Sequence, residues 1–582
     1  SHKELVGYGL TAPPVGVAPS WVPAEDRRRL AAYIARAAYI GNVARQLLPQ
    51  TVKDTRRAAH REYGEAALLV DRVVAGVLGD WTLTVDGAAG SLASGPSLPE
   101  RPSPAPENAT PLEQRIATIA QRAWDAEAEE IVAAWEVAVA TQPVARARQA
   151  TLREWAEHAE FAARLEEAEH DAAGLADAVY VLWPRADDWP LLQVIDPGMY
   201  FPELEEDGGL GSFPDRTHLA WEYDRRGPDG KSVRWVRRIT HQLVDIAATR
   251  SSPTAPVWID PLTGAESDTP TLYEGESLTP EGRIVRSYPW HEEGQPPSPM
   301  TCIVTDASWP LDKVKGTVYD EWDWSHAEVR SMRADLGCDF LPVVHVPNTP
   351  TGKDHFGRSV IDNGAQVLYD LAVNDTDSMR ASRYLGDPTI ALSGATAVDG
   401  AVAPGRIFSL GPTGQMTVLD LSAGIDKLMA AGDRLQDRFW QTSRVPAEML
   451  GRADTSGPVA GVTLALRFAP FAQIVGTMRL VRAAKYELLF RMVQRLGQVA
   501  KQIEPGPSLR ARLEFGNFLP TNRAETIELV ASALQAKAIS RQTGLLLLIS
   551  AGLPIEDAKE ELERIAAEDG ETAKAIADAT GS

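Results

Sequence analysis

The feature that most restricts the fold is a pair of helical stretches of similar length that enclose a segment rich in Gly and Pro. The first, SVIDNGAQVLYDLAVNDTDSMRASRY, opens at Ser359 with the Ser-x-x-Asp pattern of a helix N-terminus. It ends before the Gly and Pro of YLGDP. The second, SAGIDKLMAAGDRLQDRFWQTS, begins at Ser422, a favourable N-cap residue. At the usual helical rise they are about 40 and about 32 Å long, so we expect an antiparallel pair.

The enclosed segment, residues 387–421, contains short β-like runs between Gly and Pro turns. We therefore expect a small β head at the far end of the two helices. The second helix is followed by GRADTSGPVAG, residues 451–461, which is almost wholly small or polar. A tight connection between two helices needs only a few residues. This longer polar link predicts a loop that projects into open space.

The next stretch, VTLALRFAPFAQIVGTMRLVRAAKYELLFRMVQRL, is predicted to be one long helix. Its apolar residues recur every three or four positions: Leu464, Phe468, Phe471, Val475 and Met478. Pro470 in its interior predicts a kink, because the proline ring clashes with the preceding turn. A strand-like run, SLRARLEFGNF, follows, and the chain then continues in helical patterns.

The first 355 residues combine helical and β patterns. Ala-rich helical stretches flank a Pro-rich insertion at about 87–111, and Pro143 predicts a break in the second stretch. Residues 178–346 contain β-like runs, most clearly THLAWEYDRRGPDGKSVRWVRRITHQL, two alternating arms around a Gly-Pro-Asp-Gly turn. The whole pattern predicts an α+β fold that is mainly helical.

The composition excludes several classes of protein. Lys and Arg number 58 against 80 Asp and Glu, a net charge of -22, whereas proteins that grip DNA are basic. A protein that surrounds DNA without gripping it remains compatible with this charge. Cys302 and Cys338 are too few for a disulfide framework or a zinc cage. No apolar run has transmembrane length, so no membrane partner is expected.

No motif indicates catalysis or a cofactor. Lys353 follows a glycine as in a P-loop, but Asp354 replaces the required Ser or Thr, and Pro347 replaces the first glycine. There is no Gly-x-Ser-x-Gly motif. The best metal candidate is the cluster Asp320, Glu321, Asp323 and His326, whose tryptophan spacers favour a half-buried turn with solvated acids. We therefore predict no catalytic residue, no metal and no cofactor.

From His355 onward, the order of elements resembles that of portal proteins of tailed double-stranded DNA bacteriophages. FGRSVIDNGAQVLYDLAVNDTDSMRASRYLGDPTIAL is similar to a portal stem helix, and WQTSRVPAEMLG to the element that ends the second stem helix. TSGPVAGVTLALRF is similar to the tunnel loop that leads into a long kinked helix, and ISRQTGLLLLISAGLPIEDAKEELERIAAE to the crown. Residues 1 to about 175 match only by their order.

This resemblance implies a division of the chain into portal regions. They are a wing (1–355), a first stem helix (356–386), a clip (387–421), a second stem helix (422–450), a tunnel loop (451–461), a kinked wing helix with its strand (462–520) and a crown (521–582).

It also implies a function without enzymatic activity. Portal subunits form a homo-oligomeric ring, commonly a dodecamer, at one capsid vertex of the virion, after assembly in the host cytoplasm. Double-stranded DNA is packaged and ejected through the channel. The implied partners are the terminase large subunit, head-completion adaptor proteins, the major capsid protein, and a scaffold protein where one exists.

The resemblance points to two groups of site residues. The tunnel loop would contribute Arg452, Asp454, Thr455 and Ser456. The candidates for channel-facing stem residues are Asp362, Asp370, Asp426, Asp433, Arg434 and Arg438. Acidic residues would repel the DNA backbone, whereas the two stem arginines would contact phosphate or form ion pairs between subunits.

Three alternatives stay open from the sequence. Another head–tail connector or tail ring protein would share the ring but is usually smaller. An enzyme of the packaging system would need nucleotide or carboxylate motifs, which the sequence lacks. A host scaffold protein would leave the ordered C-terminal elements unexplained.

Overall fold

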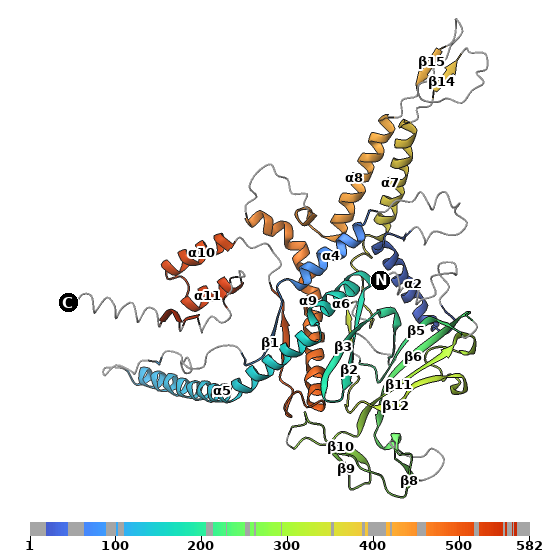
Figure 1. The fold of residues 1–582 in the computed structure, drawn as a ribbon. Helices are drawn as coiled ribbons and strands as arrows, with labels where there is room; N and C mark the ends of the chain where they lie inside the picture. Colours follow the sequence, from blue (N-terminus) through green and yellow to red (C-terminus); the bar gives the residue numbers. More distant parts are fainter. Residues whose placement is uncertain are drawn as a thin grey trace, which may run out of the picture.

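The chain folds into helices and antiparallel sheets, in agreement with the predicted α+β class. Figure 1 shows a body of helices and sheets from which one pair of helices projects. The computed structural model describes residues 19–44, 63–88, 101–102, 110–204, 213–227, 230–250, 257–260, 263–292, 294–350, 354–386, 390–393, 415–418, 422–450, 461–516, 523–550, 553, 555, 561–562 and 564–566.

The described helices include one of 48 residues, which runs unbroken through Pro143. The predicted break is therefore wrong, because a proline removes a single backbone hydrogen bond and the turns on both sides keep theirs. The helices are α2 (Ala24–Ile40), α4 (Glu65–Leu78), α5 (Pro111–His158), α6 (Phe161–Leu175), α7 (Ala365–Gly386), α8 (Ser422–Ser443), α9 (Gly461–Val499), α10 (Arg523–Gln535) and α11 (Arg541–Ser550).

The largest described sheet has five strands, in the order β12 (Glu328–Asp335), β11 (Met300–Pro310), β6 (Ser232–Asp245), β5 (Arg216–Arg226) and β4 (Tyr200–Glu203). A second sheet joins β13 (Val343–Pro347), β2 (Asp177–Arg185) and β3 (Asp188–Ile195). Two-stranded sheets pair β1 (Thr82–Val85) with β16 (Ala511–Glu514), β7 (Trp258–Ile259) with β8 (Glu266–Ser267), β9 (Glu276–Leu278) with β10 (Ile284–Arg286), and β14 (Ile390–Ser393) with β15 (Gln415–Val418).

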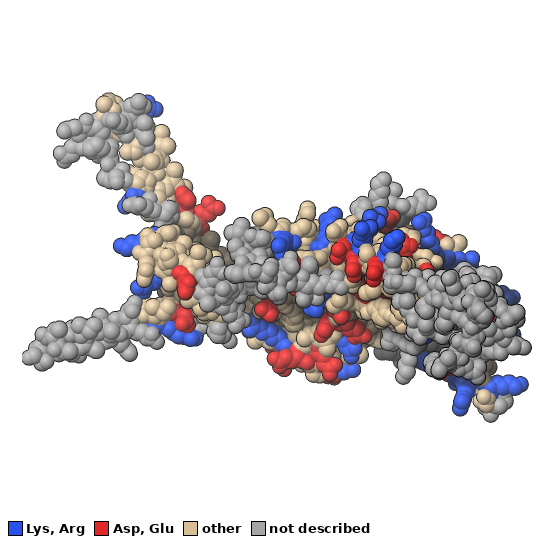
Figure 2. Space-filling model, turned by 90° about the horizontal axis from the view of Figure 1, so that it is seen from above, with Lys and Arg blue, Asp and Glu red and all other residues tan. Residues whose placement is uncertain are grey.

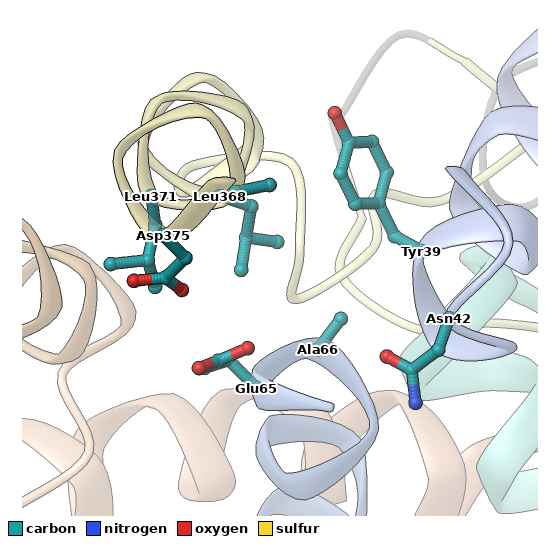
Figure 3. A pocket seen from close by; sticks show the side chains of 8 residues that line it. Tyr39, Asn42, Glu65, Ala66, Leu368, Leu371 and Asp375 are labelled. Atoms are coloured by element: carbon teal, nitrogen blue, oxygen red, sulfur yellow. The ribbon is translucent and has the colours of Figure 1, made fainter. Parts of the chain in front are cut away.

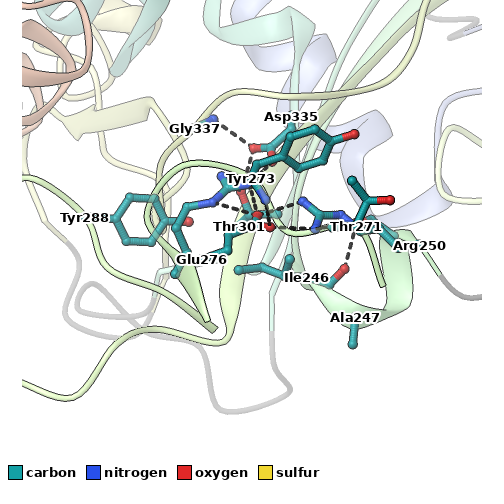
Figure 4. Close-up of polar contacts among 12 residues, drawn as sticks. Ile246, Ala247, Arg250, Thr271, Tyr273, Glu276, Tyr288, Thr301, Asp335 and Gly337 are labelled. Carbon is teal, nitrogen blue, oxygen red and sulfur yellow. Dashed lines mark hydrogen bonds and ion pairs between the residues drawn. The ribbon is translucent and has the colours of Figure 1, made fainter. Parts of the chain in front are cut away.

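β5 and β6 form the β-hairpin that is expected around the Gly-Pro-Asp-Gly turn. Arg226 pairs with Ser232 at the end nearest the turn, and the pairing continues from there along both strands. The small β7–β10 part is attached to the five-stranded sheet by ion pairs around the buried carboxylate of Glu276 (Figure 4). Arg250 donates to both carboxylate oxygens of Glu276 at 2.6 Å, and Arg286 links Glu276 to Asp335 on β12 at 2.7 Å from each. These bonds compensate the carboxylate of Glu276, whose side chain is fully buried.

Helix α9 forms the centre of the body. The predicted apolar face is buried at Phe468, Phe471, Val475 and Met478. Pro470 lies inside the helix, and Figure 1 shows that α9 changes direction near its N-terminal end. Its second half packs Phe490 against Trp155 and Phe161, which come from α5 and α6.

A fully buried ion pair joins α9 to α6. Arg482 Nε donates to Glu169 Oε2 at 2.6 Å, and the two side chains are 0% and 1% exposed. The hydroxyl of Tyr486 donates to the other oxygen of Glu169. Arg482 also donates to the backbone and side-chain oxygens of Asn348 at 3.2 and 3.0 Å. Both charges are therefore compensated inside the core, as a buried ion pair requires.

Replacing Arg482 by Met should destabilise the protein by about 3–5 kcal/mol, because the carboxylate of Glu169 would stay buried without its partner. Urea-induced unfolding followed by tryptophan fluorescence measures the change. The control is Arg164→Met, which breaks an exposed ion pair with Glu167 and should cost less than about 1 kcal/mol. Equal losses in the two variants would contradict a special role for the buried pair.

Candidate functional site

The projecting helices α7 and α8 form an antiparallel hairpin, with β14 and β15 paired at its far end (Figure 1). Each helix has 22 residues and is therefore about 33 Å long. α8 spans the stretch Ser422–Ser443 that the sequence pattern indicated, and a separate short 3-10 turn, Ala447–Leu450, follows it. α7 begins at Ala365, later than the predicted start at Ser359.

The late start of α7 has a local cause at Ser359. Its hydroxyl donates to the carbonyl oxygen of Gly174 at 2.7 Å, at the end of α6, and accepts a bond from the amide of Ile361 at 3.1 Å. The carboxylate of Asp362 accepts from the Ser359 amide at 3.1 Å. The capping pattern is therefore present, but it holds a turn against α6, and the helix begins after that turn.

The two helices approach closely where glycines face larger side chains. A Cβ on Gly364 would lie 2.6 Å from the ring of Phe439, which is fully buried. Farther along, a Cβ on Gly432 would lie 2.7 Å from the amide nitrogen of Asn374. These contacts fix which sides of α7 and α8 face each other.

A small pocket separates the base of α7 from the body (Figure 3). Tyr39, Asn42 and Glu65 line it from the body, and Leu368 and Asp375 line it from α7. Burial, together with the nearby Glu65 carboxylate, raises the pKa of Asp375. Two facing carboxylates repel each other, so this pocket favours no anionic ligand.

A buried histidine pair lies just before the hairpin. The rings of His345 and His355 stack with centroids 4.3 Å apart. His345 Nε2 is 2.8 Å from Asp177 Oδ1, and the Gly357 amide donates to the same oxygen at 2.8 Å. Burial lowers the pKa of both histidines, that of His355 to about 3. This cluster fixes the start of the hairpin segment to β2 and β13.

The predicted stem residue Asp362 lies at the base of the hairpin. Its carboxylate accepts two bonds of 2.8 Å from the guanidinium of Arg36 on α2. This ion pair lies within one chain, and it anchors the base of the hairpin to α2. The sequence pattern did not indicate Arg36, which lies 326 positions away along the chain.

Asp370 and Arg438 share the face of the hairpin that points away from the body, which we call the outer face. A residue two positions along a helix points about 200° away. Asp370 stands two positions from Leu368, which faces the body, and Arg438 stands two positions from the buried Trp440. Arg434 stands two positions from Gly432, which faces Asn374, so it points away from α7. Asp370, Arg434 and Arg438 are all exposed.

Asp426 and Asp433 occupy a different side. Together with Asp437 they recur at helical spacing, and all three are exposed. Asp437 stands two positions from Phe439, which packs on Gly364, and Asp433 stands seven positions from the buried Trp440. This stripe therefore lies between the side of Trp440 and the side of α8 away from α7. The stem candidates are thus divided between an anchor, an outer face and an edge.

The tunnel-loop candidates Arg452, Asp454, Thr455 and Ser456 lie outside the described residues. The acidic cluster around Asp320 holds a turn: the Asp320 carboxylate accepts from the Thr317 amide at 2.6 Å. Within the described ranges, no three His, Cys, Asp or Glu side chains are grouped to hold a metal ion. Among the helices described here, none combines the length and the apolar character needed to span a bilayer.

Comparison with known proteins gives only distant similarity. No family model and no curated protein matches the chain. A chain from the neck of a native GTA particle, computed with C12 symmetry, is 14% identical, with 68% of this chain and 80% of that chain covered and a TM-score of 0.29. A chain from the virion of a native gene transfer agent particle is 13% identical, with 67% and 79% covered and a TM-score of 0.27. TM-scores of this size do not establish a shared fold.

Gly364→Ala should destabilise the base of the hairpin by about 1–3 kcal/mol, because the added methyl group would overlap the buried ring of Phe439. Gly424→Ala on α8 is the matched control, since nothing lies within 4 Å of its Cβ position. That change should be neutral or stabilise by up to about 1 kcal/mol. Thermal unfolding measures both, and a stable Gly364→Ala variant would contradict the close contact.

Stability should fall as the pH drops from about 6.5 toward 3, because the unfolded chain binds protons at His355 that the folded chain resists. Part of this loss should be absent from His355→Asn. His326→Asn, at an exposed histidine, serves as the control and should follow the wild type. Chemical unfolding at several pH values is the measurement, and identical pH profiles for all three proteins would contradict the prediction.

Proposed function

We propose that this chain is the subunit of a portal-type ring at a capsid vertex of a virus-like particle. The observation that carries the proposal is the projecting hairpin of two equal helices, tipped by paired strands and followed by α9 at the centre of the body. Such a rod, held at its base by α2, α4 and α6, suits a subunit that stands beside identical neighbours around an axis.

The charge of the hairpin is consistent with a DNA conduit. The outer face carries both Asp370 and Arg438, so it is neither wholly acidic nor wholly basic. Figure 2 shows the same mixture of Lys, Arg, Asp and Glu over the described part of the body. Acidic groups among the basic ones weaken the attraction for phosphate, which lets a duplex slide.

The remaining roles follow from the portal interpretation. The clip, residues 387–421, would bind the terminase large subunit during packaging and head-completion proteins afterwards, and the wing would contact the major capsid protein. The energy for packaging would come from the terminase, because the sequence has no nucleotide-binding motif. The subunit would act without enzymatic activity of its own.

The purified protein should form rings of about twelve copies of the 63.1 kDa chain. Light scattering gives the mass, and negative-stain electron microscopy shows whether a central hole is wide enough for a duplex. A monomer or dimer at all salt and protein concentrations would contradict the ring. A smaller assembly with nuclease or ATPase activity would instead support a packaging enzyme.

A further inference from the structure

The two cysteines of the chain lie side by side in the core of the body. Cys302 is on β11, and Cys338 lies in the linker of residues 336–342, which connects β12 to β13. The amide of Cys302 donates to the carbonyl oxygen of Cys338 at 2.7 Å, and the amide of Leu336 donates to the carbonyl oxygen of Cys302 at 2.9 Å. These two bonds hold the linker against β11.

The local geometry suits a disulfide. Residues joined by a backbone bond across an antiparallel pair have Cα atoms about 5.5 Å apart, within the range of about 4.4–6.8 Å that a disulfide requires. Gly337 has a φ of +68°, a left-handed conformation that bends the linker so that both of its neighbours can bond to Cys302. The side chains also approach each other, because the Cys338 thiol, together with burial, raises the pKa of the Cys302 thiol.

Burial excludes other roles for these thiols. Both residues are 0% exposed, so neither thiol can reach a cysteine of another chain while the protein is folded. In the part of the chain that the structure describes, they belong to no group of three His, Cys, Asp or Glu side chains that could hold a metal ion. The chain has no third cysteine, so a disulfide within one chain must join Cys302 to Cys338.

We propose that Cys302 and Cys338 are a redox-sensitive pair, a dithiol under reducing conditions that closes to a disulfide when a hydroperoxide reaches the core. One sulfur attacks a peroxide oxygen, so that an S–O bond forms, the O–O bond breaks and water leaves. The second sulfur attacks the first, so that the S–S bond forms, the S–O bond breaks and a second water leaves. The two sulfurs together lose two electrons, which the peroxide accepts, and both thiol protons end in water.

This disulfide would fasten the linker to the five-stranded sheet. The linker leads into β13 of the three-stranded sheet, and its Asp339 lies 3.9 Å from the guanidinium of Arg495 on α9. The disulfide would also restrict the unfolded chain, because it closes the loop between residues 302 and 338. Oxidation should therefore stabilise the body. The inference does not depend on the ring proposed above, so either can fail without the other.

Counting free thiols in the intact protein tests the pair. Reduced protein is treated with a small excess of hydrogen peroxide, unfolded in urea and alkylated with iodoacetamide. By mass spectrometry, untreated protein should take up two alkyl groups, whereas oxidised protein should take up none and should yield a peptide crosslinked between Cys302 and Cys338. The oxidised protein should unfold about 5 °C or more above the reduced protein in a thermal scan, and dithiothreitol should reverse this shift.

The matched control is Cys338→Ala, which keeps one buried thiol and cannot close the disulfide. Its unfolding temperature should not rise after peroxide treatment, which separates the effect of the disulfide from that of methionine oxidation. Cys302→Ala serves the same purpose, and circular dichroism shows whether each variant is folded. Wild-type protein that keeps both thiols after treatment would overturn the proposal, as would oxidation of one thiol to a sulfinic acid without a crosslink.

Discussion

The buried ion pair between Arg482 and Glu169 is the interaction on which the placement of the hairpin depends. Arg482 lies on α9, the helix that follows the hairpin, and Glu169 lies on α6, against which the hairpin begins. The same guanidinium binds Asn348, whose side chain donates to the carbonyl oxygen of Arg358 at 2.8 Å. The guanidinium of Arg482 thus connects the segment that precedes the hairpin to α9, the helix that follows it. A buried cation demands several partners at once, so it specifies one arrangement of these segments.

Contacts at the base of the hairpin determine its orientation relative to the body. Ser359 binds the end of α6, Asp362 binds Arg36 on α2, and Gly364 receives the ring of Phe439. The first two contacts bind two different elements of the body, so a rotation of the hairpin would break both, and the third holds the two arms of the hairpin together. The helices beyond this base have no large apolar face against the body. Their orientation is therefore decided at the base and carried outward by helix stiffness.

Local patterns in the sequence were sufficient to predict the helices and strands, but not how these elements are oriented relative to one another. Apolar spacing and capping residues predicted α8, the β5–β6 hairpin and the buried face of α9. The start of α7 was misplaced because Ser359 finds its partner on α6, far away in the sequence. Likewise, the helical spacing of Asp426 and Asp433 shows that they share a side. Which side that is depends on contacts such as Asn374 with Gly432, and no single-sequence pattern encodes them.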